Sequence, residues 1–195
     1  YINNATGNLI LQNNTDDGDI IFQSDDASGG VETYITVDGG ARATIFSNST
    51  LLVDGKYAYF GTGYDAHVRH DGSNFSLTNT AGNINILNAT DDGDIVFQAD
   101  DGSGGNATYL TLDGGLGYTT VQKRMKFDDN TQLQFGNGGD LQFYHTGGVG
   151  VLYNNTGDFT FRQNADDKDI IFQCDDGSGG ITTYFKLDGS SENVL

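Results

Sequence analysis

The stretch DDGDIVFQADDGSGG at residues 91–105, continued by TYLTLDG at residues 108–114, occurs three times in this chain. The first copy covers residues 16–39 and the third covers residues 166–189, so each step is 75 residues and needs no gap. Residues 7–40 and 82–115 are identical at 22 of 34 positions. Similarity at a fixed period identifies a repeat array, in which each unit contacts mainly its neighbours.

Two kinds of module alternate within this repeat, in the order A-B-A-B-A. The predicted A modules are residues 1–39, 76–114 and 151–189, and the predicted B modules are residues 40–75 and 115–150. Residues 190–195 match the start of another B module. We therefore expect the chain to be a segment of a longer fibre.

The composition favours an all-β fold. The 195 residues include 29 Gly, 12 Phe and 10 Tyr but no Pro; aromatic residues suit pleated strands, and glycine suits turns. No segment longer than about ten residues carries a helical apolar period, so we expect no substantial helix. The predicted strands of the first A module are residues 8–12, 19–23 and 32–37. Those of the B modules include residues 43–46, 56–60, 66–70 and 132–135.

A long array of short strands must pair or cover its exposed edges. A single-chain β-solenoid pairs each rung with the next, whereas a parallel homotrimer shares one threefold core. A solenoid usually repeats at the length of a rung, but here the clear period is 75 residues and the apolar content is only 36%. We therefore expect an elongated, repetitive β fibre, built as a trimeric triple-stranded β shaft, with the solenoid as the alternative.

This expected structure requires a set of core residues and a set of turn glycines. The predicted core consists of large apolar and aromatic residues that recur in each A module: Ile20, Phe22, Tyr34, Ile95, Phe97, Tyr109, Ile170, Phe172 and Tyr184. Gly29, Gly104 and Gly179 stay glycine in all three copies, which predicts turns whose backbone requires glycine.

The net charge of the chain indicates which classes of partner to expect. Nine basic and 27 acidic residues give a net charge of −18. This excludes nucleic acid as an expected partner, because such binding needs a basic surface. No segment resembles a transmembrane span, and we expect no membrane insertion.

Carboxylates beside glycine-rich turns are calcium ligands in other proteins. The candidates here are Asp16, Asp17, Asp19, Asp91, Asp92 and Asp94. Their spacing does not match an EF-hand loop, and the competing interpretation is a set of solvated turn carboxylates. We expect no cofactor other than this calcium. Paired carboxylates also hydrolyse glycosides, but an active site normally breaks a repeat rather than obeying it.

Two histidines and five tyrosines are further candidate site residues. His67 and His70 lie three apart, which on a strand places them on opposite faces and is poor for one metal. The tyrosines Tyr57, Tyr59, Tyr64, Tyr144 and Tyr153 are candidates for stacking on sugars, although tyrosine is also an ordinary strand residue.

The first B module also carries a family resemblance. FGTGYD at residues 60–65, leading into HDGSN at residues 70–74, resembles a repeat of structural proteins of marine bacteriophages, notably cyanophages. The second copy is FGNGGDLQFYH at residues 135–145. The run DIIFQCDDGSGG at residues 169–180, with YFKLDG at residues 184–189, is similar to the companion repeat in those proteins.

The resemblance covers nearly the whole chain and implies a β-rich, usually homotrimeric virion appendage such as a tail or neck fibre. It supplies no catalytic residues, so we expect a structural shaft and not an enzyme. The expected location is the virion or the extracellular space. The expected partners are other copies of the chain, other virion proteins and a host surface receptor or glycan. The alternatives are a calcium-stabilised bacterial adhesin and a polysaccharide-degrading tailspike.

Overall fold

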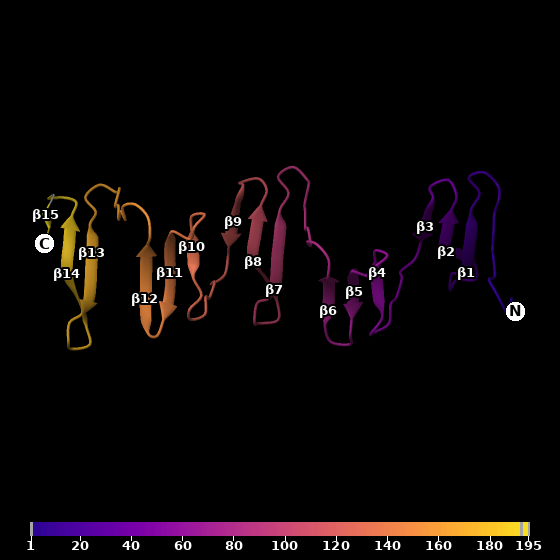
Figure 1. Ribbon diagram of the computed structural model, residues 1–195, viewed down its shortest axis with the longest axis horizontal. Helices are drawn as coiled ribbons and strands as arrows, with labels where there is room; N and C mark the ends of the chain where they lie inside the picture. The colour runs from indigo at the N-terminus through magenta and orange to yellow at the C-terminus, as the bar shows by residue number, and fades with distance from the viewer. Residues whose placement is uncertain (1, 192, 195) are drawn as a thin grey trace. The chain divides into compact units, whose positions relative to one another are not determined.

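The computed structural model describes residues 2–191, 193 and 194 and contains only β-strands as regular elements in that part of the chain (Figure 1). The strands form five three-stranded antiparallel sheets, one after another along the sequence. The predicted all-β class is therefore confirmed. None of the described residues belongs to a helix long and apolar enough to cross a membrane.

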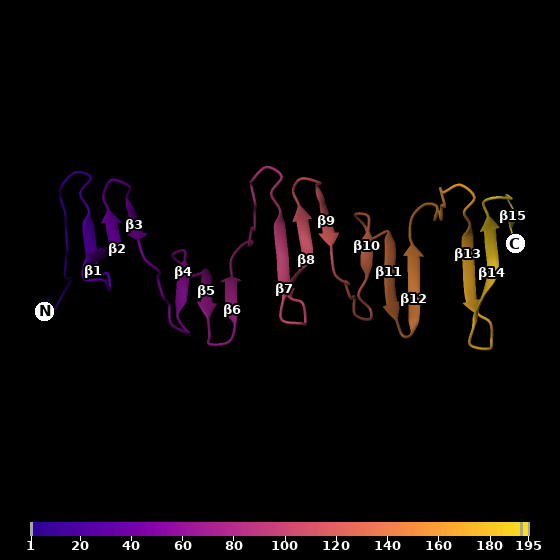
Figure 2. The same cartoon turned by 180° about the vertical axis from the view of Figure 1, so that it is seen from behind.

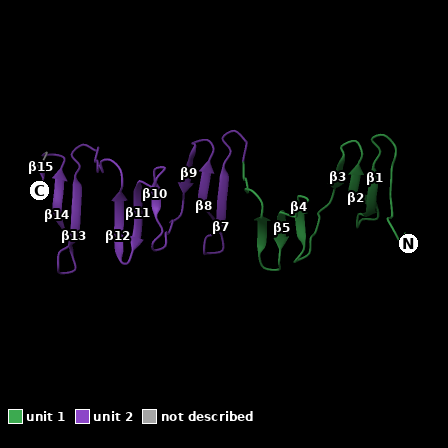
Figure 3. Cartoon of the chain, viewed as in Figure 1, with its two compact units in different colours: residues 1–87 green, residues 88–195 purple. Residues whose placement is uncertain are grey.

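Residues 1–87 and 88–195 form two compact units (Figure 3). The first unit contains two sheets. One consists of β1 (Ile20–Asp25), β2 (Val31–Asp38) and β3 (Ala43–Phe46), and the other of β4 (Tyr57–Phe60), β5 (Ala66–His70) and β6 (Phe75–Asn79).

The second unit contains three sheets, which Figure 2 shows from behind. They consist of β7 (Ile95–Asp100), β8 (Asn106–Asp113) and β9 (Tyr118–Val121); of β10 (Leu133–Phe135), β11 (Leu141–Thr146) and β12 (Val149–Asn154); and of β13 (Ile170–Asp175), β14 (Ile181–Asp188) and β15 (Asn193–Val194).

Each sheet is a meander of strands that follow one another in the sequence. Within the described residues every strand pairing is antiparallel and joins sequence neighbours. The solenoid alternative would require each rung to pair with the next, and the described strands have no such pairing. The sheets also cross the boundaries of the sequence modules, because β3 and β9 begin inside the predicted B modules but pair with strands of the A modules.

One predicted strand is wrong. Residues 8–12 form no strand, although Leu9, Ile10 and Leu11 have the apolar character that a strand favours. The equivalent residues 83–87 and 158–162 also form none. A strand needs a hydrogen-bonding partner, and within the described chain these three segments have no strand to pair with.

We call the sheets β1–β3, β7–β9 and β13–β15 the A-type sheets and the sheets β4–β6 and β10–β12 the B-type sheets. Each A-type sheet contains a β-bulge at the same position. In the first sheet Phe22 lies opposite Ile35, whereas Gln23 lies opposite Thr33, so Tyr34 has no partner residue on β1. The same shift of register follows Phe97 in the sheet of β7 and Phe172 in the sheet of β13. A bulge re-aims the side chain of the extra residue, which in all three sheets is a tyrosine of the predicted core.

Residues that lie directly opposite each other on paired strands point to the same face of the sheet. The strand register therefore shows that every sheet has one predominantly apolar face. We call this the apolar face. In chain order it consists of Ile20, Phe22, Ile35, Val37 and Phe46; Ala58, Phe60, Ala66, Val68, Phe75 and Leu77; Ile95, Phe97, Leu110, Leu112 and Val121; Leu133, Phe135, Leu141, Phe143 and Leu152; and Ile170, Phe172, Phe185, Leu187 and Val194.

The apolar faces are not covered within the chain. No hydrophobic side chain among the described residues is fully buried, and the three equivalent phenylalanines Phe22, Phe97 and Phe172 are 43%, 44% and 45% exposed. Of the other predicted core residues, Tyr34, Tyr109 and Tyr184 are exposed, while Ile20, Ile95 and Ile170 are half-buried. The single chain therefore has the strands of the predicted fold but lacks a hydrophobic core in the residues described.

Candidate functional site

The loop between the first two strands of each A-type sheet is held by a carboxylate. Oδ1 of Asp101 accepts hydrogen bonds from the backbone N–H groups of Ser103 and Gly105, at 2.7 and 3.1 Å, and from the Ser103 hydroxyl at 2.7 Å. These bonds lower the pKa of Asp101, the hydroxyl most strongly. Asp26 and Asp176 make equivalent backbone bonds, and their pKa values are lowered as well. The carboxylates thus fix the loops as local structural elements.

The predicted turn glycines lie inside these loops. Gly29, Gly104 and Gly179 have φ angles of 92°, 90° and 87°. This is the left-handed region, which a residue with a Cβ atom occupies only at a steric cost.

The six candidate calcium ligands do not converge on a common point. No group of three or more carboxylate, histidine or cysteine side chains that could hold a metal ion occurs in the part of the chain that the structure describes. Oδ1 of Asp19 instead accepts a bond from the backbone N–H of Gly39 at 3.1 Å, and Asp94 makes the same bond to Gly114 at 3.0 Å.

The remaining calcium candidates are Asp16, Asp17, Asp91 and Asp92. Asp17 and Asp92 take left-handed backbone conformations, with φ angles of 56° and 55°, which aspartate tolerates better than most residues because its short polar side chain can hydrogen-bond locally. In this geometry the turn sequences have a clear structural use, and the carboxylates do not form a calcium cage.

A second type of carboxylate contact recurs in the B-type sheets. Nδ1 of His70 lies 2.8 Å from Oδ1 of Asp54, and Nδ1 of His145 lies 2.8 Å from Oδ1 of Asp129. A carboxylate accepts only, so in each pair Nδ1 is the donor. His67 lies on the opposite face of β5 from His70, as expected for residues three apart on a strand.

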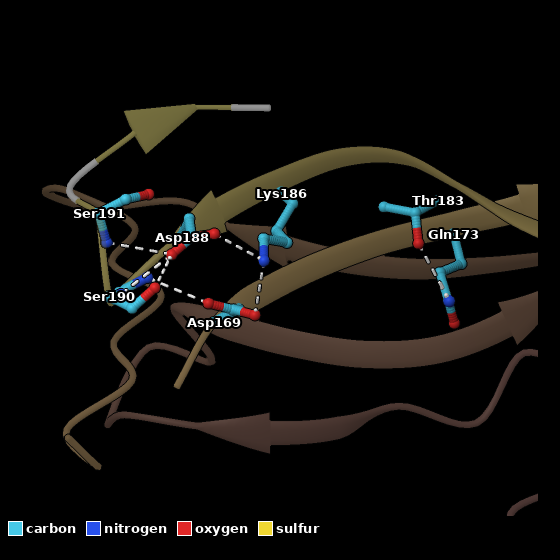
Figure 4. Close-up of polar contacts among 8 residues, drawn as sticks. Asp169, Gln173, Thr183, Lys186, Asp188, Ser190 and Ser191 are labelled. Atoms are coloured by element: carbon cyan, nitrogen blue, oxygen red, sulfur yellow. Dashed lines mark hydrogen bonds and ion pairs between the residues drawn. The ribbon is translucent and has the colours of Figure 1, made fainter. Parts of the chain in front are cut away.

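The third A-type sheet breaks the repeat with an ion-pair cluster (Figure 4). Lys186 stands where the other copies have Thr36 and Thr111, and its Nζ lies 3.0 Å from Oδ2 of Asp169 and 2.8 Å from Oδ2 of Asp188. Bonds to the two carboxylates, first Asp188 and then Asp169, raise the pKa of Lys186.

The same cluster lowers the pKa of Asp188, chiefly through Lys186 and next through the Ser190 hydroxyl. Sequence reasoning did not single out Lys186. One feature of the sequence could have identified Lys186. It replaces a threonine that the other two copies share, and aspartates equivalent to Asp169 and Asp188 occur in every copy.

The first B-type sheet breaks the repeat with an aromatic cluster, which we define as Tyr57, Tyr59, Tyr64, His67 and Arg69. The rings of Tyr57 and Tyr59 are nearly parallel, 16° apart, with centroids separated by 5.0 Å. The Tyr64 ring stands at 79° to that of Tyr59, and the Arg69 guanidinium lies 5.1 Å from the centre of the Tyr57 ring. The second B-type sheet has Gln132, Gln134, Gly139, Gln142 and Tyr144 at these positions.

The structure therefore groups three of the five candidate tyrosines in one cluster. Tyr144 and Tyr153 belong to β11 and β12 of the other unit. Comparison of the chain with protein-family models, with characterised proteins and with solved structures found no match.

Proposed function

We propose that this chain is a structural shaft segment of a phage virion appendage, and that it assembles as a parallel homotrimer through the apolar faces of its sheets. The observation that carries the proposal is the uncovered apolar face of every sheet. Ordering a residue costs about 1–2 kcal/mol of backbone entropy, and burial of apolar surface is the main term that offsets this cost. Because no hydrophobic side chain among the described residues is fully buried, the chain must obtain that burial from another molecule.

The repeat indicates that the covering molecule is another copy of the same chain. The apolar faces recur with the sequence period of 75 residues. In the three A-type sheets, Phe22, Phe97 and Phe172 occupy the same place on this face. A partner that covers all of them must offer matching apolar surfaces in the same order along its sequence. A second and third copy of this chain meet that requirement, and closed symmetric homo-oligomers are the common form of self-association.

The three unpaired segments support the same conclusion. Leu9, Ile84 and Phe159 begin the apolar residues of segments 8–12, 83–87 and 158–162, and they are 56%, 51% and 46% exposed. Their backbone groups need partners, and a neighbouring copy can supply strand pairing that the single chain does not.

Phe161 of the third segment, together with Ile170 and Leu187, lines a cleft of about 340 Å³ beside the apolar face of its sheet. Additional apolar side chains of a neighbouring copy would fill this space. The assignment to a virion appendage comes from the sequence resemblance, which implies fibres of this trimeric kind.

Light scattering of the chain, with and without EDTA, tests the assembly. We expect a mass near three times 20.8 kDa in both conditions. A monomeric wild-type chain would contradict the proposal, and a trimer that dissociates in EDTA would assign the aspartate clusters to structural calcium sites.

A matched pair of triple variants locates the interface. F22D/F97D/F172D places charges on the apolar faces and is expected to give monomers, because unpaired charges are costly to bury. I21D/V96D/I171D changes residues that are just as exposed, 52%, 48% and 51%, on the opposite faces and should leave the trimer intact. Immunogold labelling of purified phage particles tests the location, and label confined to material other than particles would contradict it.

A further inference from the structure

The aromatic cluster lies on the face of its sheet that is opposite to the apolar face. Tyr57 pairs with Arg69 and Tyr59 pairs with His67, so all four side chains share one face of β4 and β5. Phe60 and Val68 lie on the other face, with Leu77 of β6 beside Val68. The cluster consequently remains open to solvent when the apolar face is covered.

Tyr64 occupies a backbone position that favours glycine. Its φ angle is 57°, and the equivalent residue of the second B-type sheet is Gly139, with a φ angle of 66°. The turn thus requires a left-handed residue in both sheets, and glycine adopts that conformation without the steric cost that tyrosine carries. The turn alone does not explain why a tyrosine stands in the first sheet.

Two polar atoms of the cluster add to this local cost. His67 Nδ1 and Arg69 Nε are shielded from solvent and have no hydrogen-bond partner, and an unpaired polar atom is unfavourable. In the second sheet the residue equivalent to His67 is Gln142, whose Nε2 donates a bond of 2.9 Å to the carbonyl oxygen of Gly139. In the second sheet a glycine thus takes the left-handed position and Gln142 is hydrogen-bonded, whereas the first sheet keeps a strained tyrosine and two unpaired polar atoms. Strain of this kind concentrates at functional sites.

The chemistry of the cluster fits a carbohydrate. The Tyr57, Tyr59 and Tyr64 side chains are 37%, 47% and 67% exposed, and their hydroxyls form no hydrogen bond with other described residues, unlike the hydroxyls of Tyr34, Tyr109 and Tyr184. Exposed aromatic surface accepts the C–H face of a sugar ring, and free hydroxyl and guanidinium groups bond to sugar hydroxyls.

Other ligand classes fit less well. The net charge of −18 opposes nucleic acid. An apolar partner would leave the polar groups of the cluster unpaired when it covered them.

We propose that Tyr57, Tyr59, Tyr64, His67 and Arg69 form a binding site for a pyranose sugar of a surface polysaccharide. The inference does not depend on the shaft assignment, because the site lies within one sheet of one chain. The proposal gives the sheet of β4–β6 a sugar-binding role in addition to the structural role proposed for the repeat.

The test applies the fluorescently labelled full chain to a printed array of neutral, N-acetylated and uronic acid pyranose oligosaccharides. We expect binding to at least one class of oligosaccharide. The variant Y57Q/Y59Q/Y64G carries the residues of the second B-type sheet, so it should keep the fold and the solution mass, yet lose about tenfold or more of the binding. The matched control Y153T removes a similarly exposed tyrosine (48%) from the second B-type sheet, replaces it with the residue found at position 78, and should bind as the wild type does.

Absence of binding to every sugar on the array would overturn the inference, as would equal binding by the wild type and the triple variant. A proline-rich peptide is printed beside the oligosaccharides, and binding of this peptide without binding of any sugar would assign the cluster to peptide recognition and would equally overturn the inference. A monomeric chain that binds sugar would remove the shaft proposal alone, and a trimer that binds none would remove this inference alone.

Discussion

The hydroxyl of Tyr109 donates a hydrogen bond of 2.9 Å to the backbone carbonyl oxygen of Asp100. Tyr109 is the bulged residue of β8, and Asp100 is the last residue of β7. The bond therefore ties the bulge to the point where the loop begins. Tyr184 and Asp175 make the same contact at 3.0 Å, and Tyr34 and Asp25 make it at 3.3 Å.

Replacing Tyr109 with phenylalanine removes this bond and keeps the ring. Y109F is expected to reduce the local stability of the β7–β8 hairpin by about 1 kcal/mol, the usual net value of one hydrogen bond. Amide hydrogen exchange in β7 and β8 measures this change. The control is Y118F, because the Tyr118 hydroxyl bonds to no other described residue; equal exchange rates in the two variants would contradict the proposed role of the bond.

The loop of the first sheet carries strain that its equivalents lack. Ala27 has a φ angle of 64°, whereas the equivalent residues are Gly102 and Gly177, both with a φ angle of 82°. A27G is expected to stabilise the β1–β2 hairpin by up to about 1 kcal/mol, since glycine removes the clash of the Cβ atom. The converse change G102A should destabilise the β7–β8 hairpin. Amide exchange of both hairpins checks the pair, and a less protected β1–β2 hairpin in A27G would refute the argument.

Several features of the fold were predictable because they depend on local chemistry. The predicted strands at residues 19–23 and 32–37 correspond to β1 and β2 to within two residues, since β-branched and aromatic residues favour the strands and a loop rich in Asp and Gly favours the turn between them. Residues 8–12 have equally favourable strand composition, but pairing is a long-range property that composition does not contain. For the same reason the sequence could not show that β3 pairs across the boundary of its module.

The candidate sites show the same difference between what is local in the sequence and what depends on the fold. The repeated aspartates are close in sequence, and the calcium hypothesis assumed that they are also close in space. In the structure Asp19 and Asp94 each accept a hydrogen bond from a backbone N–H group of their own hairpin, and the six aspartates form no group that could hold a metal ion in the described part of the chain. Tyr57 and Tyr59 were recognisable as sugar-stacking candidates, whereas the contribution of Arg69 required the register of β4 against β5.

The loop carboxylates predict that acid weakens the A-type sheets. The pKa values of Asp26, Asp101 and Asp176 lie below the ordinary value of 3.8 in the folded chain. A lowered pKa contributes stability that is fully present above the unfolded value and is lost as the pH falls through the folded value. Circular dichroism between about pH 6 and pH 2 should therefore show loss of β structure below about pH 4. D26N/D101N/D176N should be less stable at pH 6 and show a weaker dependence on acid; an unchanged dependence would contradict this origin.

The Lys186 cluster yields the last prediction. K186T introduces the residue found in the other two copies and leaves Asp169 and Asp188 without their cation, so the β13–β14 hairpin should become less stable at low ionic strength. Salt screens charges, and the difference from the wild type should therefore shrink as sodium chloride rises toward 1 M. Amide exchange in β13 and β14 measures the effect at each salt concentration.

The pH range of this effect follows from the two pKa shifts. The pKa of Lys186 is raised above 10.5, so its contribution is present below that value and is lost as the pH rises through the folded value. The pKa of Asp188 is lowered from 3.8, so its contribution is present above that value and is lost in acid. The difference between K186T and the wild type should consequently be largest from about pH 5 to pH 9.

The control is K126T, because the Lys126–Asp128 pair has a similar distance of 3.0 Å, but its side chains are 82% and 81% exposed, against 26% for Lys186. Exposed pairs of that kind contribute little to stability, and K126T should exchange as the wild type does. If K126T and K186T behaved alike, partial burial would not distinguish the two sites, and Lys186 would be an ordinary surface cation rather than the residue that holds the two carboxylates together.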